Sequence, residues 1–235
     1  GSFANNAGTN SILGTDSVFM YSQQGTTVTN AGDITMTGAD NVAFYMDKDS
    51  NGTGGAVITN SGNITGTAGN NNVGIYNYGG TVDNYGNIAV GGSDLVFGKN
   101  GVDSNNSTYA IGIYGENAIV TNYASGTVSA GYGGYGIVAK GGTGSNFGMV
   151  TTTGDYSVGM FTDGGTVTNE LGGIINVTGD NAIGMAGKGA NSNIINHGTI
   201  NITGNDAIGM YGNIGTIITN TGTINITGNG QAFVS

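Results

Sequence analysis

The sequence NHGTINITGNDAIGMYG at residues 196–212 is the unit from which the rest of the chain is built. A close copy, NTGTINITG, begins at Asn220, and earlier copies read NAGDITMTG from Asn30 and NSGNITG from Asn60. The Asn that opens each copy falls at Asn30, Asn60, Asn84, Asn122, Asn146, Asn169, Asn196 and Asn220, with a weaker copy at Asn6. Successive spacings are 24, 30, 24, 38, 24, 23, 27 and 24 residues. Self-similarity of this length is typical of a solenoid, so the base period is 24 and the longer intervals contain insertions.

The composition favours short strands and tight turns over helices. The chain has 49 glycines, no proline and only 8% charged residues, and each glycine destabilises a helix interior by roughly 1 kcal/mol relative to alanine. Collagen is excluded because its glycine recurs at every third position alongside abundant proline. Periodic Val, Ile and Met among Gly, Asn and Thr therefore indicate strands joined by turns.

The charge balance and the lack of cysteine bear on partners and compartment. The net charge is −10 and the four basic residues are all lysines, which disfavours nucleic acid and acidic lipid as partners. A chain without cysteine suits passage through an oxidising periplasm. No apolar run approaches a membrane span, so we expect any signal peptide or anchor to lie outside this sequence, with no direct membrane insertion here. Gly1-Ser2 resembles a cloning scar and residues 228–235 stop inside a repeat, so we expect a segment of a longer solenoid.

Each copy divides into three predicted strands. In residues 216–220 and 223–228 apolar residues alternate with Thr and Asn, which places Ile224 and Ile226 inside. The same alternation in the third strand, AIGMYG, predicts that Ile208 and Met210 point inward. The corresponding pairs in earlier copies are Val18 and Met20, Val42 and Phe44, Val73 and Ile75, Val158 and Met160, and Ile183 and Met185. Three strands per 24 residues predict an all-β parallel β-helix of about nine coils, a single domain over residues 1–235 with insertions near 47–55 and 99–108.

Two kinds of polar or aromatic position recur in register. The repeated Asn predicts a ladder of amides, each donating to one neighbouring coil and accepting from the other, with a ligand site as the alternative. Two outward aromatic files stabilise the coils by stacking, or serve as a platform for sugar rings or a partner protein. The first file is Tyr21, Tyr45, Tyr76 and Tyr114, continued by Val138, Phe161, Ala186 and Tyr211; the second is Tyr85, Tyr123 and Phe147, continued by Glu170 and His197.

Residues 47–52, DKDSNG, match the opening of a calcium-binding loop. The twelfth position of such a loop is a bidentate Glu, whereas this chain has Ile58 there. An acidic, glycine-rich surface loop is the alternative, and the short glycine-aspartate repeat of calcium β-rolls does not recur. We therefore expect no metal and no cofactor, while calcium at residues 47–52 stays open.

Signals of catalysis are weak. The single histidine, His197, follows a ladder Asn without a regularly placed Asp or nucleophile, and no arginine is available to bind an acidic sugar. Some parallel β-helices cleave polysaccharides with paired carboxylates. Aspartates gather near one turn at Asp40, Asp94, Asp155, Asp180 and Asp206, but a recurrent turn Asp has a structural explanation. We expect a protein that is not an enzyme.

The stretches TVTNAGDITMTGADNVAFYM, TVTNELGGIINVTGDNAIGMAG and TIITNTGTINITG resemble the passenger repeats of large type V autotransporter adhesins of Gram-negative bacteria, notably the fusobacterial type. The resemblance spans essentially the whole chain. It implies a right-handed parallel β-helix, type V secretion and display on the outer membrane or release from the cell. It also implies virulence-related attachment of a monomeric passenger to a host-cell protein or glycan, or to other bacteria.

The insertions are the expected binding surface, because long excursions from a rigid scaffold are where binding residues concentrate. If they leave the helix at neighbouring corners, they form one composite patch with three tyrosines. The residues of this predicted patch are Asp47, Lys48, Asp49, Tyr76, Tyr85, Lys99, Asp103 and Tyr114. Three alternatives remain: a stalk that holds a distal binding domain, a polysaccharide-degrading β-helix, and an ice-binding β-helix suggested by Thr-Asn-Thr rows at residues 199–203 and 223–227.

Overall fold

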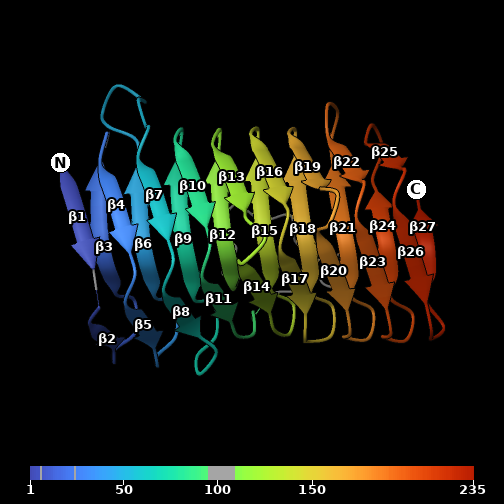
Figure 1. Ribbon diagram of the computed structural model, residues 1–235, viewed down its shortest axis with the longest axis horizontal. Coiled ribbons are helices and arrows are strands. Elements are labelled where there is room, and N and C mark those ends of the chain that lie inside the picture. The colour runs from blue at the N-terminus through green and yellow to red at the C-terminus, as the bar shows by residue number, and fades with distance from the viewer. Residues whose placement is uncertain (6, 24, 95–108) are drawn as a thin grey trace.

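The chain folds as a solenoid of short parallel strands. The computed structural model describes residues 1–5, 7–23, 25–94 and 109–235. In this part of the chain, 27 strands form three parallel sheets of nine strands each. Every third strand along the chain joins the same sheet, so each coil contributes one strand to each sheet (Figure 1). The fold is a right-handed parallel β-helix of about nine coils of about 24 residues, as predicted.

The three sheets, named A, B and C here, run through the whole solenoid. Sheet A consists of β1 (Ser2–Asn5), β4 (Thr27–Asn30), β7 (Val57–Asn60), β10 (Thr81–Asn84), β13 (Ile119–Asn122), β16 (Thr143–Asn146), β19 (Thr166–Asn169), β22 (Asn193–Asn196) and β25 (Ile217–Asn220). Sheet B consists of β2 (Thr9–Ile12), β5 (Asp33–Met36), β8 (Asn63–Gly66), β11 (Asn87–Val90), β14 (Thr127–Ala130), β17 (Met149–Thr152), β20 (Ile174–Val177), β23 (Thr199–Ile202) and β26 (Thr223–Ile226). Sheet C consists of β3 (Val18–Gln23), β6 (Val42–Asp47), β9 (Val73–Tyr78), β12 (Ile111–Glu116), β15 (Tyr135–Lys140), β18 (Val158–Asp163), β21 (Ile183–Lys188), β24 (Ile208–Gly212) and β27 (Gln231–Val234).

The core is a column of apolar side chains enclosed by the three sheets. In sheets A and B the predicted alternation holds away from the ends of the solenoid, and Ile194, Ile200 and Ile202 are fully buried next to partly buried or exposed neighbours. The strand pairing is in register, so like positions of successive coils stack, as Ile175 does on Ile200. Each coil therefore buries its apolar side chains against the coils before and after it.

The third strand of each coil departs from strict alternation. Gly209 and Met210 are both buried, whereas Ile208 is only partly buried and belongs to a different apolar cluster, on the outer face of sheet C. The prediction that Ile208, and with it the Val or Ile that begins most sheet C strands, points into the core is therefore wrong. Met210 and its equivalents do point inward. In β9, β12, β15, β18, β21 and β24 a glycine precedes the inward residue, and in β21 a Cβ built on Gly184 would lie only 2.6 Å from the carbonyl oxygen of Gly209.

The predicted asparagine ladder runs the length of the solenoid. In each rung Nδ2 donates to Oδ1 of the next coil, at 2.7 to 2.8 Å, through Asn5, Asn30, Asn60, Asn84, Asn122, Asn146, Asn169, Asn196 and Asn220. The first rung is Asn5 and not the expected Asn6, which lies outside the described residues. The ladder sits at the corner between sheets A and B, where most Nδ2 groups also donate to a backbone carbonyl, such as Gly198 O for Asn196. Buried amides are thus satisfied in a place where water is excluded.

Candidate functional site

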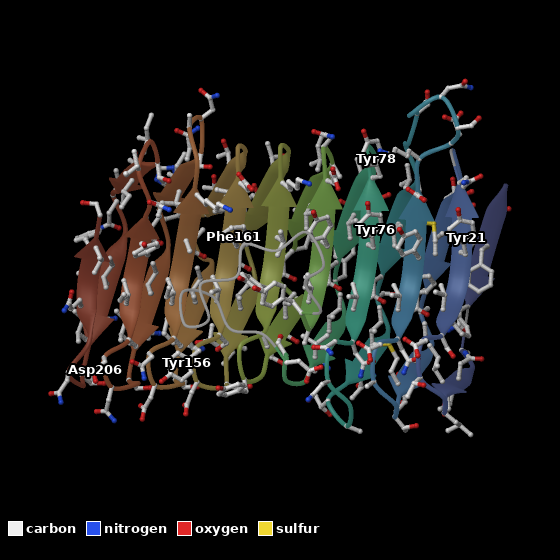
Figure 2. The ribbon with its side chains drawn as sticks, turned by 180° about the vertical axis from the view of Figure 1, so that it is seen from behind. Tyr21, Tyr76, Tyr78, Tyr156, Phe161 and Asp206 are labelled. Atoms are coloured by element: carbon white, nitrogen blue, oxygen red, sulfur yellow. The ribbon has the colours of Figure 1, made fainter. Side chains whose placement is uncertain are left out.

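The outer face of sheet C carries a file of stacked tyrosines. Tyr21, Tyr45, Tyr76 and Tyr114 lie on β3, β6, β9 and β12 and are paired in register. Their ring centroids are 5.6, 4.6 and 5.2 Å apart in sequence order, with interplanar angles of 21°, 10° and 10°. Figure 2 shows Tyr21 and Tyr76 on this face, with Phe161 farther along it. We call these four residues the tyrosine face.

Stacking decides what the tyrosine face presents to solvent. Because neighbouring rings pack nearly parallel, their flat faces cover one another, and mainly edges and hydroxyls face outward. Burial raises the pKa of Tyr76 and of Tyr114, and the Glu116 carboxylate raises both further. Their hydroxyls therefore stay protonated and can donate hydrogen bonds. The face suits polar contacts along the solenoid axis better than stacking of sugar rings on exposed tyrosines.

Charged side chains border the tyrosine face where the sheet C strands end. The Lys140 ammonium lies 3.3 Å from the Glu116 carboxylate in the preceding coil. Lys48 places its Nζ 4.9 Å from the centroid of the Tyr78 ring, within the range of a cation–π interaction. Asp47 ends β6 in the same row. Charges of both signs thus line one edge of the face.

The insertion at 47–55 leaves the solenoid between β6 of sheet C and β7 of sheet A (Figure 1). Asp49 organises it, since its Oδ1 accepts the backbone N–H groups of Asn51 and Thr53 at 2.9 Å each. The Asp47 carboxylate accepts the Lys48 N–H at 2.7 Å. In the described part of the chain no group of three His, Cys, Asp or Glu side chains is arranged to hold a metal. The two carboxylates expected to open a calcium loop are instead bonded to backbone amides of this loop.

The second predicted aromatic file lies at a different corner. Tyr85, Tyr123 and Phe147 each follow a ladder Asn, between sheets A and B. Tyr85 and Tyr123 stack with centroids 4.3 Å apart and rings inclined by 6°, and Phe147 follows at 6.4 Å. A side-chain hydrogen bond to Tyr85 and then the Asp83 charge raise the pKa of Tyr123, because both stabilise its protonated form. Tyr85 therefore stands apart from the tyrosine face.

The predicted composite patch is only partly assembled. Tyr76 and Tyr114 are neighbours on sheet C, and Asp47, Lys48 and Asp49 lie at the edge where β6 ends. Tyr85 is elsewhere, so its assignment to this patch is wrong. Lys99 and Asp103 fall outside the described residues.

The turn aspartates have structural partners. Asp155 Oδ1 accepts the backbone N–H of Asp180, and Asp180 Oδ1 accepts that of Asn205, at 2.9 and 2.8 Å. The next residue of each turn adopts positive φ, as Tyr156 does at 59° and Asp206 at 51°. Figure 2 shows these two at the same edge of the solenoid.

The single histidine also contacts a neighbouring coil, since His197 Nδ1 lies 2.6 Å from Thr221 Oγ1. No helix able to span a membrane occurs among the described residues.

One apolar feature was missed by the sequence reasoning. The outer face of sheet C carries a second cluster beyond the tyrosine face, in which Val158 and Ala186 are fully buried. Tyr114, Phe161 and Ile208 pack against it. Its signal was the Val or Ile that begins most sheet C strands, which the sequence reasoning placed in the core.

The match to a known protein family spans almost the whole chain. Residues 1–233 match the family model described as the BigA third pectate lyase-like domain. No curated protein and no solved structure matches the chain. The matched range begins before β1 and ends within β27, so it takes in all three sheets and the tyrosine face.

Proposed function

The chain belongs to the family of the BigA third pectate lyase-like domain, and from this premise we propose that it is part of a bacterial surface adhesin. In this proposal it is a segment of an autotransporter passenger of the fusobacterial type, exported by type V secretion. It is displayed at the outer membrane or released, and it attaches to a host-cell protein or glycan or to other bacteria. A long solenoid supports the proposal because it presents one repeated surface over a large distance.

The observation that carries the proposal is the tyrosine face with its charged border. Tyrosine supplies a rigid contact area with a polar end, and it is enriched where proteins bind partners. Here four tyrosines are fixed by mutual stacking, so little side-chain entropy is lost on binding. Lys48, Asp47 and Glu116 add charges of both signs beside them. Such a surface suits a polar partner that lies along the solenoid axis.

The test replaces two central rings and compares them with a matched pair elsewhere. Tyr45→Thr/Tyr76→Thr keeps β-branched residues on the strands but removes the centre of the tyrosine face. Tyr85→Thr/Tyr123→Thr removes an equally stacked pair from the corner between sheets A and B. With both variants folded by circular dichroism and displayed equally, we expect cell attachment to fall only in the first. Equal attachment by the two would contradict a binding role for the tyrosine face.

A stalk is the second candidate function, favoured by the unbroken asparagine ladder and the in-register sheets. A solenoid with continuous backbone pairing is stiff and can hold a binding domain away from the cell. Shortening residues 48–55 to a tight turn removes the described insertion without touching the sheets. Unchanged attachment by this variant and by the Tyr45→Thr/Tyr76→Thr variant would favour the stalk.

We propose further that the chain acts by binding and not by catalysis. Supporting this, the aspartates that gather at one turn, Asp155 and Asp180 among them, accept backbone hydrogen bonds. Polygalacturonate is the substrate to test, because pectate lyase-like describes the family. A lyase would create a carbon–carbon double bond that absorbs ultraviolet light. Growth of that absorbance, lost on mutation of these aspartates, would contradict the proposal.

A further inference from the structure

Tyr85 and Tyr123 form the closest ring pair among the described residues. Their centroids are 4.3 Å apart and their rings are inclined by 6°. The backbone fixes both residues at one turn, since Tyr85 N donates to Asn60 O at 2.7 Å and Tyr123 N donates to Asn84 O at 2.8 Å. Tyr85 is 40% exposed and Tyr123 is partly exposed. Two phenols of successive coils are thus held face to face at an accessible corner.

We propose that this pair is an oxidative cross-linking site at which Tyr85 and Tyr123 couple to dityrosine. The oxidant is hydrogen peroxide acting through a haem peroxidase. Each phenol gives up one electron and its phenolic proton, and the two radicals join through ring carbons ortho to the hydroxyls. Both ortho hydrogens then move to oxygen and restore the aromatic rings. Hydrogen peroxide accepts the two electrons and two protons and becomes two waters.

Geometry selects this pair over the other tyrosines. Coupling needs two radicals in contact and phenols that a peroxidase can oxidise. Tyr45 and Tyr76 are also parallel, at 4.6 Å, but neither is exposed beyond an intermediate level, whereas Tyr85 of the corner pair is exposed. Tyr132 is exposed but meets Tyr156 edge-on, at 5.9 Å and 77°. Phe147, the next ring of the corner file, has no hydroxyl, so coupling stops at the pair.

The cross-link would tie one coil to the next across the longest repeat interval. The ladder residues just before the pair, Asn84 and Asn122, are 38 residues apart. A covalent bond that closes a segment of this length lowers the entropy of the unfolded chain. We therefore expect the oxidised protein to resist denaturant better than the untreated protein. The two rings must turn out of their stack to form the bond, because it joins them edge to edge, but the paired strands already hold the two residues in adjacent coils.

The experiment treats the folded chain with peroxidase and hydrogen peroxide and locates the product. Dityrosine fluorescence should appear in a species that stays monomeric on a denaturing gel. Cleavage before Asp and after Glu and Lys releases Tyr85 in residues 83–93 and Tyr123 in residues 117–140, apart from Tyr76 and Tyr114. Fragment ions then separate Tyr123 from Tyr132 and Tyr135, which lie in the same peptide. We expect mass spectrometry to find these two peptides joined.

Phenylalanine variants make the test decisive. Tyr85→Phe and Tyr123→Phe keep a ring in the stack, so they should fold as the parent does by circular dichroism, yet each should lose the intrachain fluorescence and the rise in denaturation midpoint. Tyr132→Phe, a matched change of an exposed tyrosine, should keep both. The proposal is overturned if the joined peptides contain a different pair, if coupling occurs only between chains, or if Tyr85→Phe leaves the fluorescence unchanged.

Discussion

The Nδ2 group of Asn169 donates a 2.8 Å hydrogen bond to Oδ1 of Asn196, its counterpart one coil farther on. Both side chains are fully buried, and each continues the chain of amides on its other side. Every amide between Asn5 and Asn220, the two ends of the file, is therefore a donor to one coil and an acceptor from another. Such a chain links the stability of a coil to that of its neighbours, because removing one member leaves two others short of a partner.

Removing one rung should destabilise the solenoid measurably. Asn169→Ala leaves the Asn146 Nδ2 and Asn196 Oδ1 groups without their amide partner, and Asn196→Ala acts in the same way one coil on. Each should lower the free energy of unfolding by about 1–3 kcal/mol. The double variant should lower the free energy of unfolding by less than the sum of the two single changes. Each single variant already loses the hydrogen bond between Asn169 and Asn196, so the sum counts that bond twice. Urea titrations followed by circular dichroism give these values.

An outer row of asparagines supplies the control. Asn201 donates at 3.0 Å to Asn176 and accepts from Asn225, but on the outer face of sheet B, where water can replace a lost partner. Asn201→Ala should change stability by no more than about 0.5 kcal/mol. Equal losses for Asn201→Ala and Asn169→Ala would mean that burial of the inner ladder contributes nothing.

A charged substitution should reduce stability much more at an apolar residue in the core than at one on the outer face of sheet C. Ile200 is fully buried, so Ile200→Asp buries an unpaired carboxylate and should unfold the segment or cost several kcal/mol. Ile208 is only partly buried and outside the main core. Ile208→Asp should therefore cost much less, as measured by thermal melting. A larger loss for Ile208→Asp than for Ile200→Asp would reverse the assignment of the two faces.

The glycine that precedes the inward residue in β9, β12, β15, β18, β21 and β24 should resist substitution. A Cβ added to Gly184 would lie 2.6 Å from the Gly209 carbonyl oxygen, a backbone atom that cannot turn away. Gly184→Ala should cost about 1–3 kcal/mol through overpacking. Gly14→Ala is the matched control, because its nearest neighbour outside the adjacent residues is the Ser17 hydroxyl at 3.5 Å. Equal melting temperatures for the two variants would show that the coils can separate to admit a methyl group.

These contrasts show what the sequence could and could not predict. Period, strand number and the amide ladder were predictable, because Asn and apolar residues recur with the spacing of the coils. The orientation of Ile208 was not, since Gly209 has no hydrophobic side chain to reveal that it faces inward next to Met210. The separation of Tyr85 from Tyr76 was predictable in principle. Tyr85 follows the ladder Asn, at the end of a sheet A strand, whereas Tyr76 lies within the third strand.

Alkaline pH should destabilise the tyrosine face. Burial raises the pKa of Tyr76 and Tyr114 in the folded chain above the ordinary value of about 10. The folded state therefore holds phenolic protons that the unfolded chain releases, so their contribution to stability is complete below about pH 10 and falls as the pH rises above it. Tyr76→Phe/Tyr114→Phe removes both phenols and should flatten this decline in urea midpoints measured from neutral to alkaline pH. In the parent protein, the absorbance of phenolate should show that Tyr76 and Tyr114 ionise only at the pH at which the chain unfolds. If all tyrosines ionise while the chain stays folded, or if the double variant declines as steeply as the parent, the buried hydroxyls are not the source of alkaline sensitivity.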